Sequence, residues 1–425
     1  MNRLHLSSIG DHFNKESGTR LLMDDLGEVQ RGGQHFLNLG GGNPSHVPAV
    51  HEWFSRRLAE LSAARSLDTV FATYDEPQGP ADFREVFAKF LCARLGWPVS
   101  AENILCTSGS QASFFMLFNV LAGRDKQGDA RRILFPQSPE YIGYSDLCLF
   151  EEGLTATASK AIPTATNRFR YEIDFDALNI DETIAALCVS RPTNPSGGVC
   201  SDEEMRELTA LAMRHEIPLI VDCAYGEPFP GITFGPSQLP WSENLIVCFS
   251  LSKLGLPGLR VGIVVAQPDV IWLLTNMNTA MMLTTNSLGS RLASELFESH
   301  KLVDLVDTEI RPFYRDRANN AVALCDRYFV GLDYLLHEPG GAIFLWIWFR
   351  NLPIRSAELY KRLKQRGVLI IPGHLFAPGL SEPTHQMSEC IRVSYAQPPE
   401  IVEKGIAIIA EEVRAAFECK PSGSS

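Results

Sequence analysis

A series of short apolar segments, alternating with stretches of helical periodicity, restricts the fold of this chain more than any other feature. The segments cover residues 103–107, 132–136, 185–190, 218–222, 245–250 and 261–266. They are rich in β-branched residues or leucine and are bounded by Gly, Pro, Ser or Asn, so they are predicted to be strands. Continuous apolar strands of this kind are typical of a mostly parallel sheet covered by helices on both faces. The expected fold class is therefore α/β.

Amphipathic stretches between these segments predict helices over residues 81–95, 111–122 and 201–215. The third begins at Ser201 and has Glu204 three residues later, a pair that resembles a capping box. After about residue 285 the pattern changes to long helical stretches, a strand over 342–349 and a final helix.

This change predicts three parts of the chain. We expect an N-terminal arm of residues 1–45 that packs with the C-terminal part. A large α/β domain would follow over residues 46–300, and a smaller α+β domain over residues 301–425.

Charge and composition exclude several classes of protein. The 425 residues include 38 Lys and Arg and 50 Asp and Glu, which gives a net charge of −12. Such a chain is not expected to bind nucleic acid or an anionic membrane. It has no apolar run long enough for a bilayer and no signal sequence, so a cytoplasmic protein is expected.

The ten cysteines form no CxxC pair and no zinc spacing, so we expect reduced, mostly buried thiols and no metal.

A lysine follows the fifth apolar segment in the sequence SLSK, where Ser250 and Ser252 precede Lys253. A lysine there could simply lie at the surface. It could also be a nucleophile, because burial favours the neutral amine that attacks a carbonyl. Arg260, in the sequence GLRVG, could bind a phosphate with paired N–H donors, and the two serines could donate to the same phosphate.

Two more polar residues stand at the ends of predicted strands. Asp222 ends the fourth segment, where α/β proteins place ligands, although it could also cap the next turn. A buried carboxylate there could keep a ring nitrogen protonated, and Tyr225 could donate to a ring oxygen. Asn194, in the sequence PTNPSGG, could donate to the same oxygen or simply belong to a turn. About one strand-plus-helix unit separates Asn194 from Asp222 and Asp222 from Lys253, so all three can end on neighbouring strands.

The first predicted strand leads into a candidate anion site. Ser108, Gly109, Ser110 and Gln111 open the following helix, and amides at a helix N-terminus bind phosphate. The same residues could be an ordinary cap. Tyr141 could stack on a planar ring, or belong to the core or surface.

Together these segments resemble the class I and II aminotransferases of the fold-type I pyridoxal-phosphate group. The sequences GSQ, PEY, NPSG, DCAY, SLSK and GLRVG recur in the family's order and spacing, and the match runs from about residue 38 to 415. Three further segments extend the resemblance. Tyr74 matches a tyrosine that reaches the cofactor phosphate of the neighbouring subunit. Gly41 and Gly42 match a glycine segment near the substrate carboxylate, and Arg392 matches the arginine that binds that carboxylate.

The resemblance implies a homodimer that binds pyridoxal 5'-phosphate in the large domain. Lys253, Asp222 and Tyr225 would be the catalytic residues. Gly41, Gly42, Asn194 and Arg392 would bind the substrate. The cofactor would be held by Ser108, Gly109, Ser110, Gln111, Tyr141, Asn194, Asp222, Tyr225, Ser250, Ser252, Lys253 and Arg260, with Tyr74 supplied by the other subunit.

Finer phrases such as LGGGNP and PEYIGY are similar to one member of this family. They imply a ping-pong aminotransferase for an aliphatic amino acid, with valine expected as the donor and alanine or 2-aminobutyrate as alternatives. The acceptor would be a 2-oxo acid such as pyruvate. Two alternatives remain at this point. One is another reaction on the same cofactor, such as β-elimination, decarboxylation or cyclisation, and the other is a non-enzymatic ligand-sensing regulator.

Overall fold

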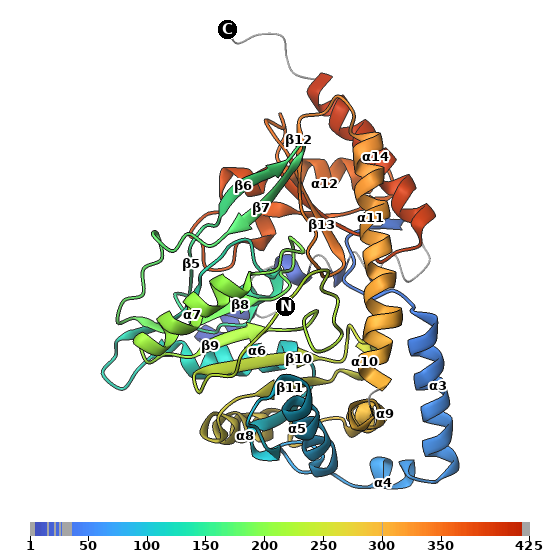
Figure 1. Cartoon of the computed structure of the whole chain (residues 1–425). Coiled ribbons are helices and arrows are strands. Elements are labelled where there is room, and N and C mark those ends of the chain that lie inside the picture. The colour runs from blue at the N-terminus through green and yellow to red at the C-terminus, as the bar shows by residue number, and fades with distance from the viewer. Residues whose placement is uncertain are drawn as a thin grey trace.

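The computed structural model describes residues 5–14, 17–20, 23–24, 27, 36–299 and 301–418. Two β-sheets lie one above the other, and the long helix α11 (Arg311–Tyr328) runs beside both of them (Figure 1).

The lower, central sheet has the strand order β2-β11-β10-β9-β8-β4, and both β3 and β5 pair with β4. Strands β4, β5, β8, β9 and β10 are parallel, while β11 runs antiparallel to both of its neighbours. The bounds are β2 Ile104–Thr107, β3 Gly123–Arg124, β4 Ala130–Phe135, β5 Leu154–Ala156, β8 Ile184–Ser190, β9 Leu219–Asp222, β10 Leu245–Ser250 and β11 Gly262–Val265.

Helices cover this sheet on both faces because successive residues of a strand point to opposite sides. Ile220, for example, joins the apolar cluster under α6 (Ser110–Leu121) and α8 (Pro268–Met282). Its neighbour Val221 joins the cluster that contains α5, α7 and α9. The other helices of this lower part of the molecule are α3 Pro48–Ala63, α4 Leu67–Ala72, α5 Ala81–Leu95, α7 Asp202–Arg214, α9 Ser287–Glu298 and α10 Lys301–Leu305.

The upper sheet has the order β15-β16-β13-β12-β7-β6 and packs against α11, α12 and α14. Its hairpin β6–β7 comes from the middle of the chain and pairs in parallel with β12. The bounds are β6 Lys160–Ala165, β7 Arg168–Glu172, β12 Tyr334–His337, β13 Phe344–Phe349, β15 Ile371–Pro372, β16 Cys390–Ser394, α12 Ser356–Gln365, α13 His385–Ser388 and α14 Pro399–Glu418.

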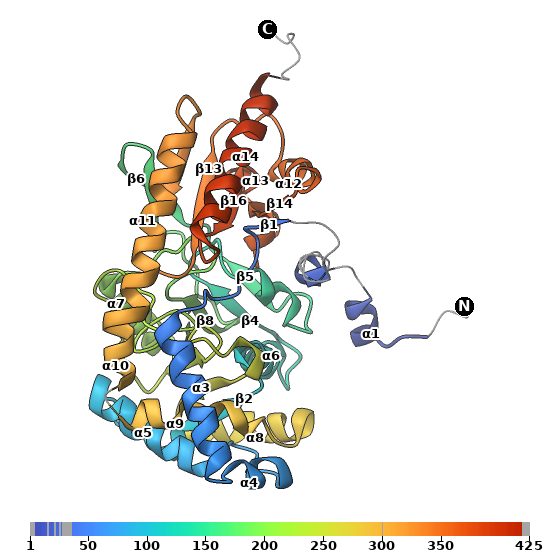
Figure 2. The same cartoon turned by 90° about the vertical axis from the view of Figure 1, so that its right-hand side faces the viewer.

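Among the described residues, a short ladder joins the N-terminal arm to the chain's C-terminal part. Strand β1 (Leu37–Asn38) pairs in parallel with β14 (Val368–Leu369), and the Ser394 amide donates to the Leu39 carbonyl at 2.7 Å. Helix α1 (Ser8–Phe13) has no buried residue and lies away from the body of the molecule in Figure 2. The domain boundaries expected at residues 45 and 300 stay a prediction, and the two sheets do not divide the chain at a single point.

The α/β fold is confirmed, and so are the predicted strands and the helices at 81–95 and 201–215. The Ser201–Glu204 capping box is present with both reciprocal hydrogen bonds. The central sheet is mostly parallel as expected, with β11 antiparallel to its neighbours, and it has eight strands among the described residues.

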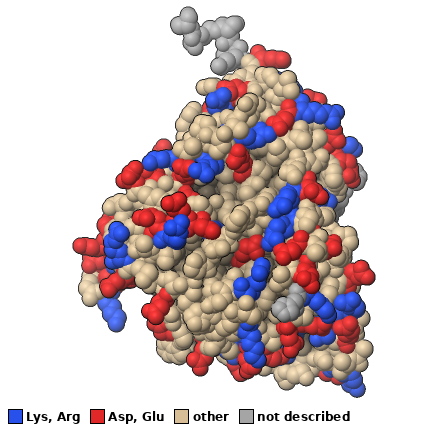
Figure 3. Space-filling view, viewed as in Figure 1, with Lys and Arg blue, Asp and Glu red and all other residues tan. Residues whose placement is uncertain are grey.

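The surface charges and the cysteines of the described residues do not by themselves point to a binding site. Basic and acidic side chains are interspersed on the face shown in Figure 3. Within the described ranges, no helix is both long and apolar enough to cross a bilayer, and no cluster of His, Cys, Asp or Glu could hold a metal ion. The nine described cysteines are free thiols, eight of them buried, and Cys419 lies outside the described residues.

Candidate active site

A cavity of about 210 Å³ lies at the carboxyl ends of β8, β9 and β10, where Ser190, Asp222 and Ser250 end their strands. Parallel strands bring these ends to one edge of the sheet, which is where open α/β sheets bind ligands. Most of the predicted site residues line this cavity: Gly42, Ser110, Gln111, Tyr141, Asn194, Asp222, Tyr225, Ser250, Ser252, Lys253, Arg260 and Arg392.

Lys253 follows β10 and points into this cavity. Its Nζ donates to the Gly42 carbonyl and lies 5.3 Å from the centre of the Tyr225 ring. Burial, reinforced by the positive charges of Arg392 and Arg260, lowers the pKa of Lys253 from 10.5 to about 8, against the opposing effect of Asp222. With this pKa, roughly one-tenth of the amine is neutral and nucleophilic at pH 7, far more than for an unperturbed lysine.

Asp222 is held in one orientation by two donors. The Tyr144 hydroxyl donates to Oδ2 at 2.7 Å, and the Ala224 amide donates to Oδ1 at 2.9 Å. Burial raises the pKa of Asp222, while these hydrogen bonds and the charge of Lys253 act in the opposite direction. A cationic N–H group from a ligand would be its natural partner in the cavity.

The start of α6 and Arg260 form an anion-binding corner. Gly109 caps the helix with a φ of +90°, and a Cβ there would lie 2.3 Å from Nη2 of Arg260. Only glycine therefore lets the guanidinium approach the helix start. Arg260 also donates to Oγ of Ser252 at 3.4 Å, so helix amides, a guanidinium and a hydroxyl converge.

Arg392 provides a second, separate cation. It lies on β16, donates from Nη1 to Oδ1 of Asn194 at 2.7 Å and from Nη2 to the Gly40 carbonyl at 2.6 Å. Its Nε has no hydrogen-bond partner, and its guanidinium lies 4.0 Å from the centre of the Phe344 ring. Burial lowers the pKa of Arg392 to about 10, and among the described residues no carboxylate pairs with it. A buried cation without a counter-ion is costly, which favours binding of a ligand carboxylate.

Two tyrosines, the buried Tyr225 and the partly buried Tyr141, complete the walls. Burial raises the pKa of both Tyr141 and Tyr225, so each keeps its phenolic proton at neutral pH. The Tyr141 hydroxyl is 3.4 Å from Oε1 of Gln111. Both rings are therefore available as neutral donors or stacking surfaces.

These groups fit the chemistry of pyridoxal 5'-phosphate. The corner at Gly109 and Arg260 suits a phosphate, and Asp222 suits a protonated ring nitrogen. The neutral amine of Lys253 could attack the carbonyl carbon of the cofactor. The orphaned Nε of Arg392 suits the carboxylate of an amino acid that the cofactor would process.

Some predicted residues lie outside the cavity wall, and some residues in it were not predicted. Tyr74 is 82% exposed in the single chain and does not line the cavity. Tyr144 was missed, although its place three residues after Tyr141 would have put both rings on one side of a helical turn. The lining residue Ile142 lies within the PEYIGY phrase, next to Tyr141, and this was the signal that could have revealed it, whereas Thr19 and Met23 belong to no recognised motif.

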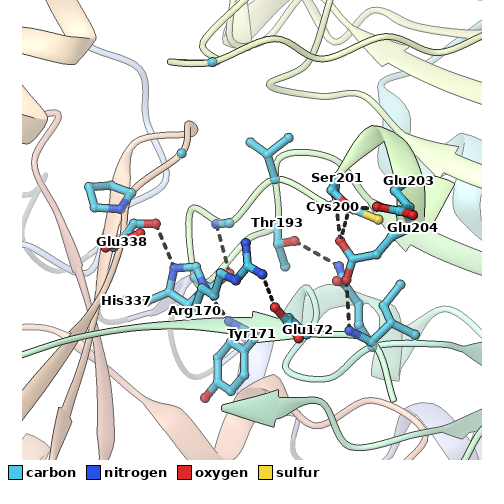
Figure 4. A pocket seen from close by; sticks show the side chains of 18 of the residues that line it. Arg170, Tyr171, Glu172, Thr193, Cys200, Ser201, Glu203, Glu204, His337 and Glu338 are labelled. Carbon is cyan, nitrogen blue, oxygen red and sulfur yellow. Dashed lines mark hydrogen bonds and ion pairs between the residues drawn. The ribbon is translucent and has the colours of Figure 1, made fainter. Parts of the chain in front are cut away.

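A second cavity, of about 750 Å³, is lined in part by Thr193, Ser196 and Gly198, and Figure 4 shows Thr193 on its wall. Its labelled wall residues include Arg170, which pairs with Glu172, and His337, whose Nδ1 lies 2.9 Å from the Glu338 carbonyl. Burial lowers the pKa of His337 to about 4, so its imidazole is neutral. None of the predicted catalytic residues lines this larger cavity.

Comparisons with known proteins agree with this geometry. The family model described as aminotransferase class I and II matches residues 34–409. The chain is 42% identical over 411 residues to the valine–pyruvate aminotransferase of Escherichia coli strain K12, covering 97% of this chain and 98% of the relative.

Solved structures show the same relationship. A crystal structure assigned as an amino-acid aminotransferase from Psychrobacter arcticum 273-4 is 39% identical, with a TM-score of 0.95 over 98% of this chain and 100% of that chain. The valine-pyruvate aminotransferase of Salmonella typhimurium LT2 is 41% identical, with a TM-score of 0.87 over 95% of this chain and 100% of that chain.

Proposed function

The chain belongs to the class I and II aminotransferases, and from this premise we propose that it moves the amino group of valine, or a similar aliphatic amino acid, to a 2-oxo acid such as pyruvate. Enzymes of this family depend on pyridoxal phosphate, and the chain is accordingly a pyridoxal-phosphate-dependent transaminase. The relatives named for valine and pyruvate support the choice of substrates.

One observation carries the substrate class. Among the described residues, the cationic side chains that line the cavity are Lys253, Arg260 and Arg392. Lys253 is needed for the cofactor, Arg260 for its phosphate and Arg392 for the substrate carboxylate. No cation is then left for a second carboxylate, so dicarboxylic amino acids would bind poorly.

The rest of the wall suits an aliphatic side chain. Met23, Ile142, Pro192 and Ala224 are apolar, and Thr19 contributes a buried hydroxyl without a partner. A branched hydrocarbon buries its surface against such groups favourably.

In the proposed mechanism, pyridoxal phosphate supplies a reactive carbonyl and a ring that accepts the electron pair released at Cα. When bound, the cofactor would be held covalently by Lys253. The Lys253 amine, once free, would carry the proton away from Cα of the amino acid in the first half-reaction and would return a proton to Cα of the product in the second. Arg392 holds the carboxylate through both halves.

Several residues would keep the charges of the bound cofactor in place. Asp222 would accept a hydrogen bond from the protonated ring nitrogen. Asn194 and Tyr225 would donate to the ring oxygen, and the Gly109–Arg260 corner would hold the phosphate. We further propose a homodimer in which Tyr74 reaches the phosphate of the partner subunit, and a cytoplasmic location.

A half-reaction screen tests this proposal. The purified holoenzyme is mixed with single amino acids, and the cofactor absorbance and the released 2-oxo acid are measured. We expect fast bleaching by valine, alanine or 2-aminobutyrate, with one equivalent of 2-oxo acid formed. Fast bleaching by glutamate but not by valine or alanine would overturn the substrate class. Bleaching with release of ammonia or carbon dioxide would indicate a different reaction on the same cofactor.

A further inference from the structure

Glu140 is a buried carboxyl group that the proposed mechanism does not use. Its side chain is 0% exposed, and it lies directly before Tyr141 in the loop between β4 and the 3₁₀ turn Ile142–Asp146. Among the described residues, no Lys, Arg or His lies within ion-pair distance of it. A buried carboxyl group without a cation is unusual and must be stabilised by hydrogen bonds.

Three donors satisfy Glu140. The Ser190 amide donates to Oε1 at 3.0 Å, and Nε2 of Gln137 donates to the same oxygen at 2.9 Å. The Ser190 hydroxyl donates to Oε2. The Glu140 amide itself donates to the Phe376 carbonyl at 3.0 Å, so this one residue connects three separate segments of the chain.

The same contacts reach Asn194 through Thr193. The Thr193 hydroxyl donates to the Ser190 carbonyl at 3.1 Å and accepts from Nε2 of Gln137 at 3.0 Å. Thr193 and Gln137 both line the larger cavity, and Figure 4 labels Thr193 on its wall. Asn194 follows directly and accepts from Arg392 at 2.7 Å, which leaves its amide N–H groups free to donate into the smaller cavity.

We propose that Glu140 is a positioning residue: it clamps the start of the 190–194 loop to the 137–141 loop and thereby holds Asn194 against the cofactor oxygen and Arg392. The inference rests on the proposed function only in placing the cofactor between Asp222 and Lys253. Glu140 touches neither substrate nor cofactor and acts through Ser190 and Thr193.

The clamp does not require a negative charge. Burial raises the pKa of Glu140 to about 7, with a further upward contribution from Asp222 and opposing hydrogen bonds from Ser190 and Gln137. The other titratable groups that face it are Tyr144 and the thiols of Cys188 and Cys200, all of which are neutral. A protonated Glu140 can still accept at Oε1 and can donate from Oε2 to the Ser190 hydroxyl, so the same contacts persist in both states.

This property makes Glu140→Gln the informative variant, because an amide reproduces the protonated form. Glu140→Ala removes every side-chain contact. Glu389→Ala serves as a matched control, since Glu389 is also a buried carboxyl, 6% exposed, that accepts from Trp348 Nε1 at 2.8 Å but does not line the cofactor cavity.

Four quantities are measured on each holoenzyme: the cofactor dissociation constant, the pH midpoint of the visible absorption of the lysine-bound cofactor, and KM and kcat for valine. Loss of the Asn194 donor removes a hydrogen bond that favours the ionised ring oxygen, so the midpoint should rise in Glu140→Ala. We expect the dissociation constant and KM to rise about tenfold in this variant, with a smaller change in kcat. Glu140→Gln and Glu389→Ala should stay near wild type in all four quantities.

The measurements on the Glu140 variants can overturn the proposal in several ways. An unchanged midpoint and dissociation constant in Glu140→Ala would overturn the proposal. Equal damage in Glu140→Gln would also overturn it, because charge rather than the clamp would then be responsible. If Glu140→Ala does not fold, Ser190→Ala replaces it, and a midpoint unchanged in that variant overturns the proposal. If the wild type itself binds no pyridoxal phosphate, the proposed function fails, which is a separate result.

Discussion

The Tyr144 hydroxyl donates a 2.7 Å hydrogen bond to Oδ2 of Asp222, at the centre of the apolar cluster under α6. The Tyr144 ring stacks on Phe135 at 5.4 Å and is fully buried, and burial raises its pKa well above 10. Tyr144 is therefore a permanent donor that favours the ionised form of Asp222. The Tyr144 hydrogen bond therefore helps to keep a negative charge on Asp222, next to the proposed position of the ring nitrogen.

Tyr144→Phe should reduce kcat about tenfold, because a hydrogen bond to a charged group is lost while the aromatic packing is kept. Since the lost bond lowers the pKa of Asp222, the acid limb of the kcat–pH profile should move to higher pH. Tyr171→Phe is the control, since Tyr171 is a partly buried tyrosine whose hydroxyl accepts from Trp346 Nε1 at 3.1 Å in the upper sheet, away from Asp222. An unchanged kcat and acid limb in Tyr144→Phe would remove Tyr144 from this role.

Lys253→Ala should lose turnover by at least about 10⁴-fold, since both the covalent link and the proton carrier disappear. In the wild-type apoprotein, the rate of covalent cofactor uptake should rise about tenfold per pH unit below pH 8 and level off above it, because only the neutral amine reacts. This follows from a pKa of about 8 for Lys253. A rate that keeps rising to pH 10 would mean that the lysine is not perturbed.

Arg392→Ala should raise KM for the amino acid by about 10–100-fold, because a charge-assisted contact with the carboxylate is lost. Arg392→Lys should recover only part of this, because an ammonium group cannot bond Asn194, Gly40 and the ligand in the same planar geometry. Steady-state kinetics with valine measures both. A normal KM in Arg392→Ala would assign the carboxylate to another cation.

Hybrid dimers test the proposed role of Tyr74 across the interface. One chain carries Tyr74→Ala and the other Lys253→Ala, and each variant is inactive or impaired as a homodimer. If Tyr74 acts on the partner, the hybrid contains one complete site and should show about half of wild-type activity. A hybrid no better than the two homodimers, or an active monomer by light scattering, would contradict it.

The locations of the strands could be predicted from the sequence better than the directions in which the strands pair. The apolar run at β11 was recognised, but an apolar run carries no sign of direction, so its antiparallel pairing with β10 and β2 could not be predicted. The hairpin β6–β7 was missed because its strands are half exposed, with little apolar periodicity. Its partner β12 lies far away in sequence.

Site residues were predictable where they stand at strand ends in recognisable motifs. Asn194, Asp222, Lys253 and Arg260 come together in one cavity as expected, although their roles stay predictions. Glu140 and Tyr144 were part of the quoted PEYIGY phrase, yet their partners Ser190 and Asp222 lie 50 and 78 residues away. Only the three-dimensional structure brings such pairs together.

The most direct test of the central claim follows the amino group through both half-reactions. Holoenzyme is bleached with valine, freed of excess amino acid and then mixed with pyruvate. We predict that the cofactor absorbance returns and that one equivalent of alanine forms per active site, with its nitrogen derived from ¹⁵N-labelled valine. Bleaching that pyruvate cannot reverse, or alanine without the label, would contradict the proposal that this chain is a valine–pyruvate type aminotransferase.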